Sequence, residues 1–296
     1  MDIYVQSRTK NADYYWVSQS TAPTKVQNVP SIIQSVTKFN GNNDLKLIHE
    51  SDPSIVLLRS PSESELLLLV SGLRTKRQDK DRRYIRNSIA WIAQDADEPI
   101  LREIAVLVLK NNLRILENVV VESSNNSDEL FEVNWEDIKQ LTPPNITDTT
   151  NFPEDNGKIA LFSEQRMQEL ASELENCTLP ARDGALVAVT AGFKPKAIFE
   201  RANVWRALSN DTSISPEKWH DLHFIQDSSG YRSNENKPTN DNKENDFDPV
   251  VNYVTEILPE NMREGARDFW SDFKKKSGIV FVIFITAIAF FLARRL

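Results

Sequence analysis

The most constraining feature of this 296-residue chain is an apolar run near its carboxyl end, Gly278–Ala293, which contains no charged residue. A helix of this length rises about 24 Å, slightly less than the roughly 30 Å of a bilayer's hydrocarbon core. Lys276 and Arg294 flank the run, and basic side chains at such positions extend their charges to the membrane interfaces. The sequence therefore predicts a single transmembrane helix over residues 277–293.

The residues before this run predict its orientation. Phe269, Trp270 and Phe273 precede it, where an aromatic belt at the interface is expected. The amino terminus, "MDIYVQSRTKNADYY", lacks the apolar segment of a secretory signal. Cys177 is the sole cysteine, so no intramolecular disulfide can form, which agrees with a reducing compartment. We therefore expect a tail-anchored, single-pass membrane protein whose amino-terminal part lies in the cytoplasm.

The amino-terminal half predicts a β-rich domain and a connector. Residues 1–121 contain short runs of β-branched and aromatic residues separated by polar clusters, with two helices that start at Pro30 and near Pro99. Residues 122–156 hold nine acidic residues against one basic residue, and three prolines. This composition is typical of an exposed acidic connector.

The second half predicts a smaller unit. Residues 157–226 alternate strand and helix patterns, including the continuous apolar strand "GALVAVT", which favours a parallel α/β sheet. Residues 227–248 are a polar linker, and residues 249–273 contain amphipathic helices that precede the membrane. The predicted fold class is mixed α/β, with a β-rich amino-terminal domain, a small α/β unit and a carboxyl-terminal transmembrane helix.

Glycine spacing argues against several enzyme classes. The chain has eight glycines and no two lie closer than eight positions, so neither a phosphate-binding P-loop nor a dinucleotide-binding turn is present. A nucleophile elbow and the protein-kinase signatures are also absent. His220 and His223 could share a helical face, and Cys177 could be a nucleophile, but no further Cys or His is close to the histidines. We therefore predict no metal site and no cofactor, and favour binding over catalysis.

Two segments are candidate binding sites. The first is "VTAGFKPK", where Gly192, Lys194 and Lys196 follow a buried strand and precede a helix, a position that attracts anionic ligands. An ordinary α/β turn has the same pattern.

The second segment lies between two predicted strands, so it should form a hairpin tip. Seven basic residues occur there within thirteen positions: Arg74, Lys76, Arg77, Lys80, Arg82, Arg83 and Arg86. Such a patch could contact lipid head groups, an acidic protein or nucleic acid. Alternatively, it is a solvated loop that Asp79 and Asp81 partly neutralise. The net charge of −8 argues against nucleic acid, and we expect a protein partner in addition to the membrane.

Five segments, "MDIYVQSR", "LLLLVSGL", "DRRYIRNSIAWIA", "LPARDGALVAVTAG" and "VWRALS", resemble an uncharacterised group of bacterial tail-anchored proteins associated with signalling and defence gene clusters. The resemblance covers about half of the chain and includes no catalytic signature. It implies a bacterial membrane and an adaptor role. The function expected from the sequence is therefore a cytoplasmic binding module on a membrane anchor. The alternative is a membrane-tethered enzyme that acts on a nucleotide or a phosphorylated small molecule.

Overall fold

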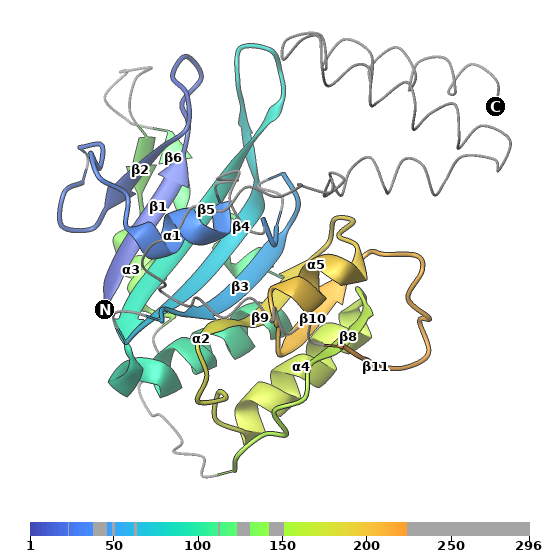
Figure 1. The fold of residues 1–296 in the computed structure, drawn as a ribbon. Coiled ribbons are helices and arrows are strands. Elements are labelled where there is room, and N and C mark those ends of the chain that lie inside the picture. The colour runs from blue at the N-terminus through green and yellow to red at the C-terminus, as the bar shows by residue number, and fades with distance from the viewer. Residues whose placement is uncertain are drawn as a thin grey trace, which may run out of the picture. The chain divides into compact units, whose positions relative to one another are not determined.

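A computed structural model describes most of the first 223 residues, and residues Met1–Ser229 form one compact unit (Figure 1). The described residues are 1–22, 24–37, 46–48, 51–61, 64–111, 113–122, 131–141 and 151–223. The predicted linker (227–248), juxtamembrane helices (249–273) and transmembrane helix (277–293) lie outside them, as do the predicted interface residues Phe269, Trp270, Phe273, Lys276 and Arg294. Within the described ranges, no helix combines the length and apolarity that a membrane crossing requires.

The described strands form one nine-stranded sheet and a separate two-stranded sheet. The order across the large sheet is β11-β8-β10-β9-β3-β4-β5-β1-β2. Its strands are β1 (Asp2–Ser7), β2 (Tyr15–Ser18), β3 (Ser54–Arg59), β4 (Glu65–Gln78), β5 (Tyr84–Gln94), β8 (Lys158–Leu161), β9 (Gly184–Thr190), β10 (Arg206–Ser209) and β11 (His220–Asp221). The small sheet pairs β6 (Val120–Glu122) with β7 (Phe131–Val133).

Helices cover both faces of the large sheet, which explains why its central strands are apolar on both sides (Figure 1). One core lies between the sheet and the long helices α2 (Glu98–Lys110) and α4 (Glu164–Asn176), which pack against each other. The opposite core lies under the short helices α1 (Ser31–Thr37) and α5 (Lys196–Arg201). A five-residue helix, α3 (Trp135–Lys139), and two 3₁₀ turns, Asp95–Asp97 and Arg114–Leu116, complete the described elements.

The two stretches that the sequence divides at the acidic connector contribute to the same sheet. Strand β3 pairs with β4 on one side and with β9 on the other, for example Leu57 with Leu68 and with Val187. The mixed α/β class is confirmed, but the sheet is mostly antiparallel. Parallel pairing occurs between β8 and β10 and between β10 and β9. The parallel α/β pattern of residues 157–226 is thus one end of a larger sheet.

A buried ion pair joins the two halves on the α2–α4 side. Arg102 is fully buried, and its Nε donates to Glu98 Oε1 at 3.0 Å. Its Nη1 donates to the carbonyl oxygen of Leu174 at 2.6 Å, and the Leu179 N–H donates to Glu98 Oε1 at 2.9 Å. The pair therefore connects α2 to the end of α4 and to the loop that follows α4. Buried charges are tolerated when they are paired and hydrogen-bonded in this way.

Candidate interaction surface at the β4–β5 hairpin

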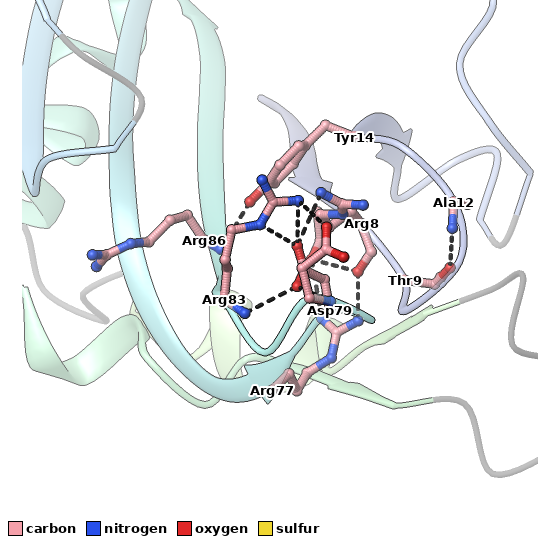
Figure 2. A network of polar contacts seen from close by, with 10 residues as sticks. Arg8, Thr9, Ala12, Tyr14, Arg77, Asp79, Arg83 and Arg86 are labelled. Atoms are coloured by element: carbon pink, nitrogen blue, oxygen red, sulfur yellow. Dashed lines mark hydrogen bonds and ion pairs between the residues drawn. The ribbon is translucent and has the colours of Figure 1, made fainter.

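The predicted basic hairpin is the connection between β4 and β5, and Asp79 organises its turn (Figure 2). The Asp79 side chain is 3% exposed. Its Oδ1 accepts from the backbone N–H groups of Asp81 and Arg83, each at 2.9 Å. This local bonding stabilises a turn in which Arg82 has a φ of 61°, in the left-handed region. The tip is therefore a defined turn, and Asp79 and Asp81 partly neutralise it through Arg83, as the alternative interpretation of the segment expects.

The same carboxylate contacts two arginines from separate segments, Arg8 after β1 and Arg83 just before β5. Asp79 Oδ2 accepts from Arg83 Nε at 2.9 Å and forms an ion pair with Arg8 Nη1 at 3.5 Å. Burial alone would raise the pKa of Asp79, but the hydrogen bonds from Arg83 and Asp81 outweigh it and lower that pKa. The same contacts raise the pKa of Arg83, which also pairs with Asp81 at 2.9 Å. Asp79 therefore stays ionised and fixes both guanidinium groups.

Arg77 is directed into the fold on this side of the hairpin. Its Nη1 donates to Ser7 Oγ at 3.0 Å, and its Nη2 donates to the carbonyl oxygen of Arg8 at 2.6 Å. Ser7 Oγ in turn donates to Asn87 Oδ1 at 2.7 Å. These contacts connect the end of β1 to the hairpin, so Arg77 has a structural part in the predicted basic patch.

Arg74 and Arg86 belong to the other side of the hairpin. The two are paired across β4 and β5, and in Figure 2 the Arg86 side chain points away from Asp79. Arg74 Cζ lies 3.9 Å from the centroid of the Tyr84 ring, a cation–π contact. Arg86 Nη1 donates to the carbonyl oxygen of Gly72 at 3.3 Å.

The remaining cations of the predicted patch face solvent. Lys76, Lys80 and Arg82 are exposed. Tyr14, to which the sequence did not point, completes the surface; it is 41% exposed and accepts from the Arg86 N–H at 3.1 Å. Arg8, which the sequence did not point to either, supports the surface through its ion pair with Asp79. No local pattern could identify either residue, because β1 reaches the hairpin only through sheet pairing with β5. We call Lys76, Lys80, Arg82, Arg83 and Tyr14 the hairpin tip surface.

The predicted site in "VTAGFKPK" is only partly assembled at the end of β9. A Cβ on Gly192 would lie 2.3 Å from Asp52 Oδ2, so the Asp52 side chain packs closely against the backbone of Gly192. Lys194 is 8% exposed, and burial lowers its pKa, with a further lowering by Lys46 and an opposing effect of Asp52. Gly192 and Lys194 therefore lie beside Asp52 at the carboxyl end of the strand.

Lys196 is not part of that group. Its backbone N–H donates to Asp211 Oδ2 at 3.1 Å, and its Nζ pairs with Glu200 Oε1 at 3.5 Å, one turn along α5. The six residues of α5 leave its first turn committed to Asp211 and to the preceding loop. Lys196 therefore stabilises α5 rather than extending the Lys194 site.

The predicted His and Cys candidates lie on separate elements. His220 is in β11, with Nε2 3.3 Å from the Ser215 carbonyl oxygen, whereas the His223 N–H donates to Glu200 Oε1 at 3.3 Å. Cys177 follows the last residue of α4 and is a free thiol. In the ranges that the structure covers, no three His, Cys, Asp or Glu residues are grouped to hold a metal ion.

Comparison with known proteins adds no family assignment: no protein-family model, curated protein or solved structure matches this chain.

Proposed function

We propose that this chain is a tail-anchored membrane protein whose cytoplasmic folded unit is a binding module. The hairpin tip surface is its contact for an acidic region of a partner protein. The observation that carries the proposal is the cation-rich hairpin tip, whose turn and Arg83 guanidinium are fixed by the buried Asp79 carboxylate. Surfaces fixed before binding lose little conformational entropy on association.

The residue types of the surface favour a protein partner. Arg and Tyr are enriched at the energetic centres of protein interfaces, and here Tyr14 lies within a group of arginines. Asp79 and Asp81 lie among the cations. Those carboxylates, and the net charge of −8, disfavour a polyphosphate, whereas a protein surface of mixed charge can pair with both signs.

The membrane part of the proposal depends on the sequence. The uncharged run Gly278–Ala293, with Lys276 and Arg294 at its ends, has the composition of a membrane anchor. An anchor at the carboxyl end leaves the folded unit in the cytoplasm, where an adaptor for signalling or defence complexes would act. The resemblance to bacterial tail-anchored proteins supports the same role.

The test places a photo-crosslinking amino acid at position 80 of the full chain in living cells, with position 139 as the control. Lys139 is also an exposed lysine, on α3. We expect a discrete protein adduct from position 80 alone, which disappears when Lys76 and Arg82 are changed to Glu. The matched reversal Arg114→Glu, at an exposed cation after α2, should leave the adduct intact. Identical adducts from positions 80 and 139, or adducts only to lipid or nucleic acid, would contradict the proposal.

A membrane-tethered enzyme is the second candidate, and one observation favours it. Lys194 is a buried lysine with a lowered pKa at the carboxyl end of β9, where ligands of α/β sheets bind. Its substrate would be a nucleotide or a phosphorylated small molecule. Turnover of such substrates by the purified full chain, lost in Lys194→Met and retained in Lys196→Met, would establish it.

A further inference from the structure

A cleft of about 350 Å³ lies at the end of the β1–β2 pair where β1 begins, near the N label in Figure 1. Two short segments contribute its described lining, one from β1 and one from the end of β2: Asp2, Ile3 and Tyr4, and Ser18, Gln19 and Ser20. Strand pairing holds the segments together, because Tyr4 is paired with Ser18 and the Gln19 N–H donates to the Ile3 carbonyl oxygen at 3.1 Å. Pockets that bind small molecules begin at roughly 300 Å³, so the cleft can hold a small ligand.

The β2 side of the cleft carries hydroxyl groups that are fixed by bonds to one another. Ser18 Oγ lies 3.1 Å from Ser20 Oγ and 2.7 Å from Thr21 Oγ1. Thr21 Oγ1 also accepts from the Ser18 N–H at 3.3 Å, and Ser18 is only 5% exposed. A hydroxyl group has one proton and two lone pairs, so Ser18 and Ser20 retain lone pairs that can accept from a ligand.

The β1 side of the cleft carries negative charge. Asp2 is exposed, and its carboxylate forms no ion pair or hydrogen bond with another described residue. Tyr4 is half-buried, and its pKa is raised by burial first and then by the charges of Asp2 and Glu65. Two carboxylates therefore act on the Tyr4 ring, which gives this side of the cleft a negative potential.

These groups match an organic cation better than an anion or a metal ion. An ammonium group has three N–H donors, and a carboxylate and two hydroxyl oxygens are suitable acceptors for them. An aromatic ring such as that of Tyr4 attracts a cation within about 6 Å and also packs against its carbon atoms. Mg²⁺ and Ca²⁺ take about six oxygen ligands or more, whereas Asp2 is the only carboxylate among the described lining residues.

We propose that this cleft binds a small aliphatic amine. Its ammonium group donates to the Asp2 carboxylate and to the hydroxyl oxygens of Ser18 and Ser20, and its carbon atoms pack against the Tyr4 ring. The cleft lies at the opposite end of β1 from the hairpin, since the strand from Asp2 to Ser7 rises about 17 Å. The site is therefore separate from the hairpin tip surface and does not rest on the proposed protein contact there.

The test measures binding of 1,4-diaminobutane to the full chain in detergent at pH 7 by isothermal titration calorimetry, with 1,4-butanediol as the uncharged counterpart of equal length. We expect saturable binding of the diamine and no binding of the diol. Asp2→Asn should weaken the dissociation constant roughly ten- to hundredfold, the value of one charge-assisted hydrogen bond. Asp13→Asn, which removes an exposed carboxylate from the connection between β1 and β2, should bind like the wild type.

A second readout locates the binding and separates it from folding. The fluorine resonance of 3-fluorotyrosine at position 4 should shift when the diamine is added, and at the same concentration it should not shift in Asp2→Asn. Without ligand, Asp2→Asn should melt like the wild type, because Asp2 has no contact with a described side chain to lose. The tip variant Lys80→Glu/Arg82→Glu should still bind the diamine, even if the protein contact at the tip fails. Equal binding of diamine and diol, equal weakening by Asp2→Asn and Asp13→Asn, or an unchanged fluorine resonance would overturn the proposal.

Discussion

Replacing Arg102 with Met should destabilise the folded unit more than most single substitutions. Arg102 is fully buried and donates to both Glu98 and the Leu174 carbonyl oxygen. Methionine keeps most of the volume of the side chain but none of its donors. The Glu98 carboxylate, whose side chain is 11% exposed, would retain only the Leu179 N–H as a partner. Leaving a buried charge without its counterion costs roughly 3–5 kcal/mol.

A second substitution tests whether the unpaired charge is the cause. Adding Glu98→Gln to Arg102→Met removes the charge, while the amide oxygen still accepts from the Leu179 N–H. Replacement of both partners of a buried pair is often nearly neutral. The Leu174 carbonyl oxygen remains unpaired in both variants, which costs about 1–3 kcal/mol. The double variant should therefore recover roughly half of the loss.

The assay is urea unfolding of the full chain in mild detergent at pH 7, followed by tryptophan fluorescence. The six tryptophans include Trp91 and Trp205, which are both fully buried. A loss below about 1 kcal/mol in the single variant would show that the ion pair does not hold α2 to α4. A double variant no more stable than the single would refute the argument from an unpaired charge.

Three further predictions concern the turn, the Asp52 contact and the tail. Asp79→Asn should weaken partner binding although it makes the surface more positive, because Arg8 and Arg83 lose their common anchor. The pKa of Asp79 is lower in the folded state than in the unfolded state, where it is near 4. Ionised Asp79 therefore stabilises the fold fully above pH 4, and this stabilisation is lost as the pH falls through the lowered folded-state pKa. The melting temperature of Asp79→Asn should accordingly fall less steeply with acidification than that of the wild type. Gly72→Ala should cost about 1–3 kcal/mol in urea unfolding, since the new methyl group would lie 2.2 Å from the Asp52 backbone oxygen at a φ of 68°. An unchanged midpoint would contradict that contact. Deleting residues 274–296 should release the protein into the soluble fraction, and Ile283→Arg should do so in part, since a mid-span charge costs roughly 2.5–3.5 kcal/mol of insertion free energy. Pelleting of the truncated protein with membranes after a high-salt wash would show another attachment.

The sequence predicts those helices and turns that depend on neighbouring residues. The helix near Pro99 is α2, with Pro99 in its first turn, and the helix predicted at Pro30 is α1, which begins at Ser31. The sequence predicts a hairpin tip from the seven-cation segment, and Lys80, Arg82 and Arg83 lie in the turn between β4 and β5, whereas the other four cations lie on the two strands. Each of these features depends on residues within a few positions of one another.

The order of the strands in the large sheet depends on pairing between distant segments, which the sequence did not predict. β3 is apolar on both faces, which a central strand of either a parallel or an antiparallel sheet would be, so its pairing with β9 could not be inferred. The sequence divided the folded unit at residues 122–156, whereas the sheet continues across the division. The prediction that this segment is an exposed connector is wrong in part, because it contains β7 and α3 and contributes Phe131 and Ile138 to the core. Sequence composition reports the polarity of a connector, but it carries no information on which strands meet at either side of it.

The candidate sites also differ from the sequence prediction because they depend on contacts between residues that are distant in the sequence. The sequence by itself determined the charge of the hairpin, the apolar carboxyl-terminal run and the lack of nucleotide-binding glycine motifs, because these are properties of contiguous residues. Only the tertiary structure sorted the hairpin cations, since strand alternation places Arg77 against Ser7 and Arg74 and Arg86 on the opposite face. It also brought Asp52 against Gly72 and Gly192, through contacts that sheet pairing creates between distant segments of the chain.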